Sequence, residues 1–363
     1  MHSPFTDFSF PADGGLSRYG WTEALDSAFA EHRGAGLTPA RIARVDLGRC
    51  EAVTENGLVR ARISRSRYAD PLLAPCTGDW AALSPAPDPG LVALLPRRGA
   101  IVRSSASRSS HGQVLAANVD TVVVAVSLAV PLNRGRVERL LALAWDSGAQ
   151  PVVVLTKADL AADTAGVHSE VGELAPGVEI VTTSAVTGQN MDVLTALLSG
   201  TTVLLGPSGA GKSALGNVLL GDEVLATGAV RAQDGKGRHT TVHRELLLLP
   251  GGGVLIDTPG LRGIGLHDAA DGLAQVFAEI EHLAEDCRFS DCGHNTEPGC
   301  AVQDAIRAGE LAERRLASFR KLQRENDWAA SRTDSRLRDE RVNRQKAITS
   351  HLRATYRLRD KQS

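Results

Sequence analysis

The chain has 363 residues and a formal net charge of −2, with 43% hydrophobic and 23% charged residues, a composition typical of a soluble globular protein of two or three domains. No apolar run approaches the roughly 20 residues that span a bilayer, and the N-terminal residues lack the basic start and apolar core of a signal peptide. Five cysteines in a chain of this length exclude a secreted disulfide framework. We therefore expect a cytoplasmic monomer without a membrane partner.

Residues 1–37 are weakly patterned, with one helix expected over residues 21–32, and form an N-terminal extension. The segment "RIARVDLGRCEAVTENGLVRARIS" then alternates apolar and polar residues on both sides of Asn56-Gly57, which predicts a tight hairpin. Further short apolar runs follow at close spacing, so residues 38–112 are predicted to form a small closed β-barrel, OB-like or SH3-like. The stretch "PRRGAIVRSSASRSSHGQ" is expected to be an exposed, flexible loop.

Residues 113–265 have a different hydrophobic pattern. The runs "VDTVVVAVSL", "PVVVLT", "VEIVTT", "TTVLLG" and "GGVLID" are almost continuously apolar, as in parallel strands buried on both faces. Helical stretches such as "RVERLLALAWDSG" lie between some of them. Alternating strands and helices predict a doubly wound α/β domain, and hence a multi-domain α/β chain.

The run "TTVLLGPSGAGKSALGNVLL" joins an apolar strand, a glycine-rich loop and an amphipathic helical pattern. In such a phosphate loop the backbone N–H groups wrap phosphates, the lysine reaches the β- and γ-phosphates, and the serine hydroxyl binds Mg²⁺. The alternative is an accidental glycine-rich turn. The predicted nucleotide-binding residues are Gly206, Pro207, Ser208, Gly209, Ala210, Gly211, Lys212, Ser213 and Ala214, with Lys212 also assigned to catalysis and Ser213 to Mg²⁺.

Two later segments match the switch regions of nucleoside triphosphatases that have such a phosphate loop. "GVLIDTPGLRG" places Asp257 at a strand end, where it can hold the Mg²⁺ shell while the Gly260 N–H senses the γ-phosphate; a simple turn is the alternative. The polar loop "DGKGRHTTVH" offers a hydroxyl, Thr240 or Thr241, that can complete the Mg²⁺ shell, and Thr241 is the assigned ligand. A plain surface loop is the alternative there.

A candidate base-reading motif precedes the phosphate loop. Thr156-Lys157-Ala158-Asp159 is close to the Asn-Lys-x-Asp pattern of GTPases, in which the aspartate accepts hydrogen bonds from guanine N1–H and its exocyclic amine. Taken alone it could be a chance tetrapeptide. It follows a predicted buried strand, however, and the next strand ends in Thr183-Ser184-Ala185, which matches the element that backs guanine. The predicted guanine-site residues are Thr156, Lys157, Asp159, Ser184 and Ala185.

Residues 266–363 begin with an apolar helical stripe over residues 267–287 and continue with "CRFSDCGHNTEPGC". Cys287, Cys292, His294 and Cys300 form a closed set of three thiolates and an imidazole, suited to one structural Zn²⁺, unless they are unrelated reduced cysteines. From residue 311 onward fifteen Lys/Arg face seven Asp/Glu. This basic, largely helical tail suggests a polyanionic partner, with a solvated helix face as the alternative.

The order of these motifs is base reader, base backing, phosphate loop, switch one and switch two. Together with the strings "AANVD", "GRHTT" and "DTPGLR", the preceding barrel and the following cysteine cluster, it resembles the circularly permuted, ribosome-small-subunit-dependent GTPases of the RsgA (YjeQ) family over about residues 38–355. One departure is Thr156, where the family usually has Asn; threonine can supply one hydrogen bond to the phosphate loop but not two.

The resemblance implies hydrolysis of GTP to GDP and phosphate, stimulated by the small ribosomal subunit, and a role in late maturation of that subunit. It implies His239 as the catalytic group, since Leu261 stands where Ras-like enzymes carry the water-orienting Gln; a structural loop histidine is the alternative. It also supports zinc at the cysteine cluster and contact with ribosomal RNA. The candidate RNA-contacting residues are Arg314, Arg315, Arg320, Lys321, Arg324, Arg336, Arg338, Arg341, Arg344 and Lys346 in the tail, and Arg97, Arg98, Arg103 and Arg108 in the barrel.

Three other functions stay open at this point: an RNA-binding placeholder whose nucleotide only sets affinity, a metal-delivering GTPase whose cysteine cluster hands over its metal, and an ATPase.

Overall fold

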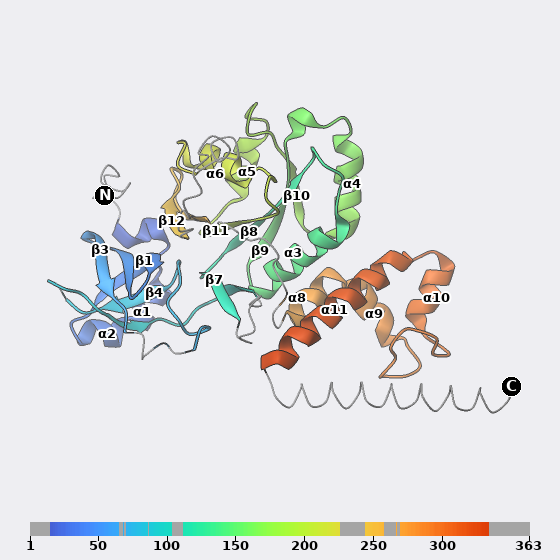
Figure 1. Ribbon diagram of the computed structural model, residues 1–363, viewed down its shortest axis with the longest axis horizontal. Coiled ribbons are helices and arrows are strands. Elements are labelled where there is room, and N and C mark those ends of the chain that lie inside the picture. The colour runs from blue at the N-terminus through green and yellow to red at the C-terminus, as the bar shows by residue number, and fades with distance from the viewer. Residues whose placement is uncertain are drawn as a thin grey trace.

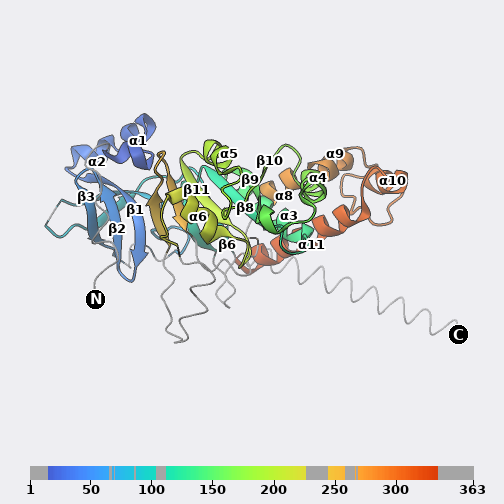
Figure 2. The ribbon, with the colours of Figure 1, turned by 90° about the horizontal axis from the view of Figure 1, so that it is seen from above.

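The computed structural model describes residues 15–64, 68, 70–85, 87–103, 112–225, 244–257, 266 and 269–333. Figures 1 and 2 show three parts in a row: an N-terminal β-structure, a central sheet flanked by helices, and a C-terminal group of helices. Over the described residues, no helix combines the length and apolarity that crossing a membrane requires. This arrangement confirms the predicted multi-domain α/β fold.

The N-terminal part is a five-stranded antiparallel sheet in the order β3-β2-β1-β4-β5. A parallel bridge between Arg62 and Gly90 brings its two edges together, so the sheet closes as in an OB-like barrel. The predicted Asn56-Gly57 hairpin connects β2 and β3. The strands are β1 (Thr38–Asp46), β2 (Arg49–Thr54), β3 (Gly57–Arg62), β4 (Trp80–Leu83) and β5 (Leu91–Leu94), preceded by η1 (Gly15–Tyr19), α1 (Glu23–Ala28) and α2 (Ala30–Gly34).

The stretch predicted as a flexible loop contains a strand, so that prediction is wrong for part of its length. β6 (Ala100–Arg103) pairs antiparallel with β7 (Gln113–Ala117). Ile101 is fully buried in the core, and this burial holds the segment although arginines and serines surround it in the sequence. The β6–β7 pairing joins the two sides of the boundary predicted at residue 112.

The central sheet has six strands in the order β10-β9-β8-β11-β13-β12, all parallel except β12. Its valines alternate between two cores: Val122 packs on the side of α3 and α4, and Val123 on the side of α5 and α6. The strands are β8 (Thr121–Ser127), β9 (Gln150–Thr156), β10 (Glu179–Thr182), β11 (Thr201–Leu205), β12 (Glu245–Leu248) and β13 (Val254–Asp257). The helices are α3 (Arg134–Asp146), η3 (Ala158–Leu160), α4 (Thr164–Leu174), α5 (Met191–Leu197) and α6 (Lys212–Leu220).

A buried arginine joins the barrel to this sheet. Arg41 of β1 is 1% exposed, stacks its guanidinium 4.8 Å from the Trp80 ring centroid and donates a 2.6 Å hydrogen bond to the Thr201 hydroxyl. Arg44 adds an ion pair with Glu245 on β12. Because Thr201 begins the strand that leads to the phosphate loop, the barrel is anchored directly to that strand.

The C-terminal part comprises α8 (Ala270–Val276), α9 (Ala278–Glu285), α10 (Ala301–Ala308) and α11 (Glu313–Thr333). The single helix predicted over residues 267–287 is in fact two, because the backbone of Phe277 leaves the helical region at φ −116°, ψ 34°. The Phe277 ring is buried against Phe319 and the Arg315 guanidinium, so tertiary packing fixes the break. The helical spacing of apolar residues continues across it, which is why the sequence did not reveal it.

Candidate functional site

The phosphate loop follows a fully buried strand, β11, and ends where α6 begins. Gly206, Gly209 and Gly211 all have positive φ, and a Cβ on Gly206 would lie 2.7 Å from the Ala125 carbonyl oxygen, so the loop needs glycine there. Lys212 Nζ donates to the carbonyls of Gly206 at 2.8 Å and Pro207 at 2.9 Å. The lysine therefore lies across the loop, in reach of the space that the loop encloses.

The base-reading segment is tied to the phosphate loop. Thr156, the last residue of β9, is 4% exposed and donates its hydroxyl proton to the Ala210 carbonyl at 2.8 Å. The Val126 carbonyl lies farther away, at 3.4 Å. Lys157 has φ 61°, and its Cε is 3.9 Å from the position that a Cβ on Gly211 would take. Segments 54 residues apart in the chain thus share one site.

The two loops that should hold a guanine base also contact each other. The Ser184 hydroxyl donates to Asp159 Oδ1 at 2.6 Å, and Ala158 N–H donates to the Thr183 carbonyl at 3.0 Å. Asp159 Oδ2 has no partner among the described residues, and Ala185 is half-buried beside Ser184. The Ser184 hydroxyl therefore orients the aspartate through one of its two oxygens.

Asp257 ends β13, next to β11 in the sheet, so it lies at the same edge as the phosphate loop and Ser213. It pairs in register with Glu245 of β12. Burial raises the pKa of Glu245, Arg44 opposes the shift, and the Asp257 charge adds to it. Hydroxyl and carboxylate oxygens are the donors that Mg²⁺ prefers, so Ser213 and Asp257 fit this ion. His239, Thr240, Thr241 and Gly260 lie outside the described residues.

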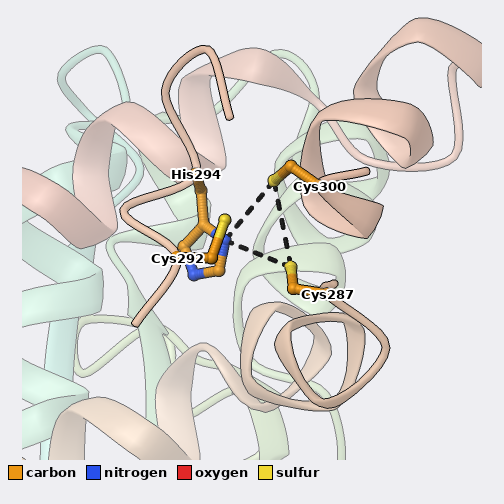
Figure 3. Close-up of side chains that lie close together, drawn as sticks. All are labelled: Cys287, Cys292, His294 and Cys300. Carbon is orange, nitrogen blue, oxygen red and sulfur yellow. Dashed lines mark hydrogen bonds between the residues drawn. The ribbon is translucent and has the colours of Figure 1, made fainter. Parts of the chain in front are cut away.

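The cysteine cluster is assembled from three segments (Figure 3). Cys287 follows α9, His294 lies in the loop with φ 57°, and Cys300 caps α10. Cys287 Sγ lies 3.6 Å from His294 Nδ1 and 3.9 Å from Cys300 Sγ, and the Cys300 sulfur lies 3.5 Å from the same nitrogen. With Cys292, all four ligand atoms lie within 4.8 Å of one another.

These separations fit zinc. An ion held at about 2.3 Å by sulfur and about 2.0 Å by nitrogen keeps its tetrahedral ligands about 3.5–3.8 Å apart. Cys300 is 1% exposed, and burial, with the nearby Arg320 charge, lowers the pKa of His294, which favours the neutral imidazole that binds metals. The four donors therefore suit a closed structural site.

The loop that carries His294 is held from outside by two side chains. Arg320 of α11 donates to the carbonyls of Gly293 and His294, and Gln303 of α10 donates to the same His294 carbonyl. Arg320 is one of the residues predicted to contact RNA, whereas its guanidinium supports the zinc loop. No pattern in the sequence indicates this contact, because a charge count does not tell which carbonyl an arginine will meet.

Two other arginines that were predicted to contact RNA have internal partners instead. Arg315 is 5% exposed and its guanidinium bonds Glu138, Glu279 and the Val276 carbonyl. Arg97 donates to Asp79 and to the carbonyls of Leu72 and Ala74. Both guanidinium groups are already used inside the protein. Arg108, Arg336, Arg338, Arg341, Arg344 and Lys346 lie outside the described residues.

Comparison with known proteins identifies the family to which this chain is related. The family model described as "RsgA GTPase" matches residues 94–267. A small ribosomal subunit biogenesis GTPase RsgA of Streptomyces coelicolor is 57% identical over 330 residues, 90% of this chain and 90% of that protein, and one of Streptomyces avermitilis is 58% identical over 90% and 89%. The crystal structure of YjeQ from Thermotoga maritima matches with a TM-score of 0.58 and 26% identity, over 79% of this chain and 97% of that one.

Proposed function

This chain belongs to the RsgA GTPase family, and from that premise we propose that it hydrolyses GTP in response to the small ribosomal subunit and acts late in the assembly of that subunit. The observation that carries the proposal is the hydrogen bond from Thr156 to Ala210. It unites a guanine-reading segment with a phosphate loop that follows it in the chain, as a permuted GTPase requires.

Guanine is recognised by the paired loops. The Asp159 carboxylate accepts hydrogen bonds from guanine N1–H and the exocyclic amine, while Ser184 keeps Oδ1 in place. The Lys157 stem lies along the base, and Ala185 backs it. Adenine offers no donor pair at these positions, so GTP is preferred to ATP.

The phosphates lie in the loop from Gly206 to Ala214. Lys212 exchanges its bonds to the Gly206 and Pro207 carbonyls for the β- and γ-phosphate oxygens. Ser213, Asp257 and Thr241 would hold Mg²⁺, with Thr240 the other candidate, and the Gly260 N–H would meet the γ-phosphate. When bound, the ion neutralises charge on the phosphates.

The remaining parts support binding to the ribosome. One Zn²⁺ held by the three cysteines and His294 keeps the C-terminal module folded. The domains are residues 1–37, 38–112, 113–265 and 266–363. The partner is the small subunit and its RNA, and the protein works as a cytoplasmic monomer.

The test is GTP turnover with and without purified small subunits, in the parent protein and in His239→Ala. We expect unaided turnover of about 10⁻³ s⁻¹ or below, because Leu261 cannot orient water. We expect His239→Ala to bind GTP normally and lose most of the stimulated turnover, while His168→Ala, on the exposed side of α4, behaves as the parent. Stimulated turnover that is unchanged in His239→Ala would remove that residue's role, and a parent protein that subunits do not stimulate would overturn the function.

A further inference from the structure

A cavity of about 190 Å³ opens where α3 of the central domain crosses α11 of the C-terminal helical part, residues 266–363, which we call the zinc module. The helices approach closely, since a Cβ on Gly135 would lie 3.9 Å from the Ser318 hydroxyl. The cavity is several times the volume of a water molecule. Its lining includes Asn133, Gly135, Arg136, Arg139, Ser318 and Lys321. We refer to it as the α3–α11 groove.

The acidic groups near the groove are already neutralised. Glu138 is fully buried and accepts hydrogen bonds from Arg314, Arg315 and Ser318. Glu325 pairs with Arg139. Both of these carboxylates are thus already paired with an arginine.

Several basic groups of the groove, by contrast, have N–H donors without a partner among the described residues. Arg136 and Lys321 are exposed and form no ion pair with any described residue. Arg139 Nε is buried and has no hydrogen-bond partner in the part of the chain that the structure describes. Asn133 uses its side-chain oxygen on the Arg136 N–H, which leaves its amide group free to donate. Arg136 and Lys321 therefore line one cavity from two helices without an acidic partner among the described residues.

We propose that the α3–α11 groove binds the phosphate backbone of RNA, and this proposal rests on the proposed function for its partner. Guanidinium and ammonium groups without an acceptor match phosphate oxygens. No aromatic ring lines the cavity, so base stacking is not the mode of binding. The Lys/Arg surplus from residue 311 onward extends the same sign of charge along the chain.

A strand bound in the groove would hold the GTPase domain and the zinc module at once. Arg136 and Arg139 come from the helix that follows β8, and Lys321 comes from the helix that supports the zinc loop through Arg320. Glu325, the partner of Arg139, also accepts the Leu266 N–H at 3.4 Å. Leu266 therefore lies beside α11, the helix that supplies Ser318 and Lys321 to the groove.

The test is the salt dependence of binding to purified small subunits and, separately, to a short RNA duplex, with Arg136→Gln/Lys321→Gln. Losing two phosphate contacts should weaken binding about 25- to 60-fold at 0.1 M salt and lower the slope of log K against log salt by about 1.4–1.8. The matched control is Arg62→Gln/Arg307→Gln, which removes the same charge from exposed arginines that already pair with Asp88 and Asp304. Unaided GTP turnover should not change in either variant.

Equal losses in the two variants, or none in the groove variant, would overturn the proposal. So would displacement of RNA by poly-glutamate as effectively as by unlabelled duplex, which would indicate an acidic protein as the partner. If the parent protein does not bind subunits, the proposed function fails, and the duplex titration alone then decides on the groove. A variant with Arg136→Lys/Lys321→Arg should bind RNA as tightly as the parent protein, because it keeps both positive charges.

Discussion

At the scale of single residues, Thr156 is the most informative departure from the usual GTPase pattern. A hydroxyl has one proton, and the shorter distance assigns it to Ala210 rather than to Val126. Asparagine would offer two N–H donors at this position. The tie between base reader and phosphate loop therefore depends on a single side-chain hydrogen bond.

Thr156→Val keeps the shape of the side chain and removes this bond. The Ala210 carbonyl then loses its donor, at a cost of about 1–2 kcal/mol, or about five- to thirtyfold in affinity for GDP. Titration with a fluorescent GDP measures the change, and Thr156→Ser, which keeps the hydroxyl, should stay within about twofold of the parent. Equal affinity in the valine and serine variants would show that the bond does not hold the site.

The candidate ligand-binding residues were easier to identify from the sequence than the residues that support them. The phosphate loop and the four candidate metal ligands each lie within a short stretch of the chain, so their spacing could be recognised. Arg320 and Arg315 were counted only as positive charges, yet one supports the His294 carbonyl and the other is buried against Glu138. Their partners lie on distant segments, and only the folded chain brings them together.

At the scale of elements, the crossing of α3 and α11 depends on a buried ion cluster. Glu138 belongs to a helix whose apolar pattern was visible, but its carboxylate is fully buried and lies 177 residues in sequence from Arg315. Such a cluster is costly to desolvate, and removing one member leaves a buried charge without its partner.

We therefore expect Glu138→Gln to lower the free energy of unfolding by about 3–5 kcal/mol, because Arg314 loses its carboxylate partner and the buried Arg315 keeps only Glu279. The matched control is Glu170→Gln, whose partner Arg134 is half exposed, and there the loss should stay below about 1 kcal/mol. Denaturant unfolding followed by circular dichroism measures both. Similar small losses in the two variants would mean that the cluster does not hold the helices together.

Elements with strong periodicity were predicted well, and irregular ones were not. The buried valine runs identified the central strands because few other structures use such runs. β6 was missed since its four residues lie among arginines and serines, and the break at Phe277 was missed because the apolar spacing continues through it. In both places the burial of one side chain fixes the backbone conformation: Ile101 in β6 and Phe277 at the helix break.

At the scale of the whole molecule, the Cys/His cluster is the feature on which we expect the fold of the C-terminal part to depend. The loop from Cys287 to Cys300 contains no helix or strand among the described residues, and its four candidate ligands come from both of its ends and its middle. A bound Zn²⁺ would add about 10 kcal/mol or more to the stability of such a loop.

Removal of zinc by a strong chelator should increase hydrogen exchange in residues 287–300 and in α10, while GDP binding persists because the guanine site lies in the central domain. Mass spectrometry of exchanged peptides measures the first and fluorescent GDP the second. Cys292→Ser should reproduce the effect, and Cys50→Ser, a buried barrel cysteine, should leave the module unchanged. Zinc that leaves with no rise in exchange would contradict a structural role and favour metal delivery.

The order of parts along the chain could be predicted, but their docking could not. The alternation of runs identified barrel, α/β domain and helical module. Nothing in the sequence marked Arg41 as the side chain that joins barrel and sheet, because it alternates with apolar residues as a surface-facing strand residue would. Whether a strand residue faces solvent or another domain is decided by the whole assembly.

The strand order of the central sheet also governs how the chain can fold while it is being made. β8, β9 and β10 are synthesised in succession and can pair at once, yet the other side of β8 belongs to β11, whose Thr202 pairs with Thr121. Until β11 leaves the ribosome, β8 presents an unpaired backbone edge. The half-sheet of β8, β9 and β10, which contains the candidate base-reading segment, can therefore form before β11, the strand that precedes the phosphate loop. β13 is synthesised later still. A translational pause after β10 would therefore prolong exposure of that edge, at the stage when the nascent chain is most prone to aggregate.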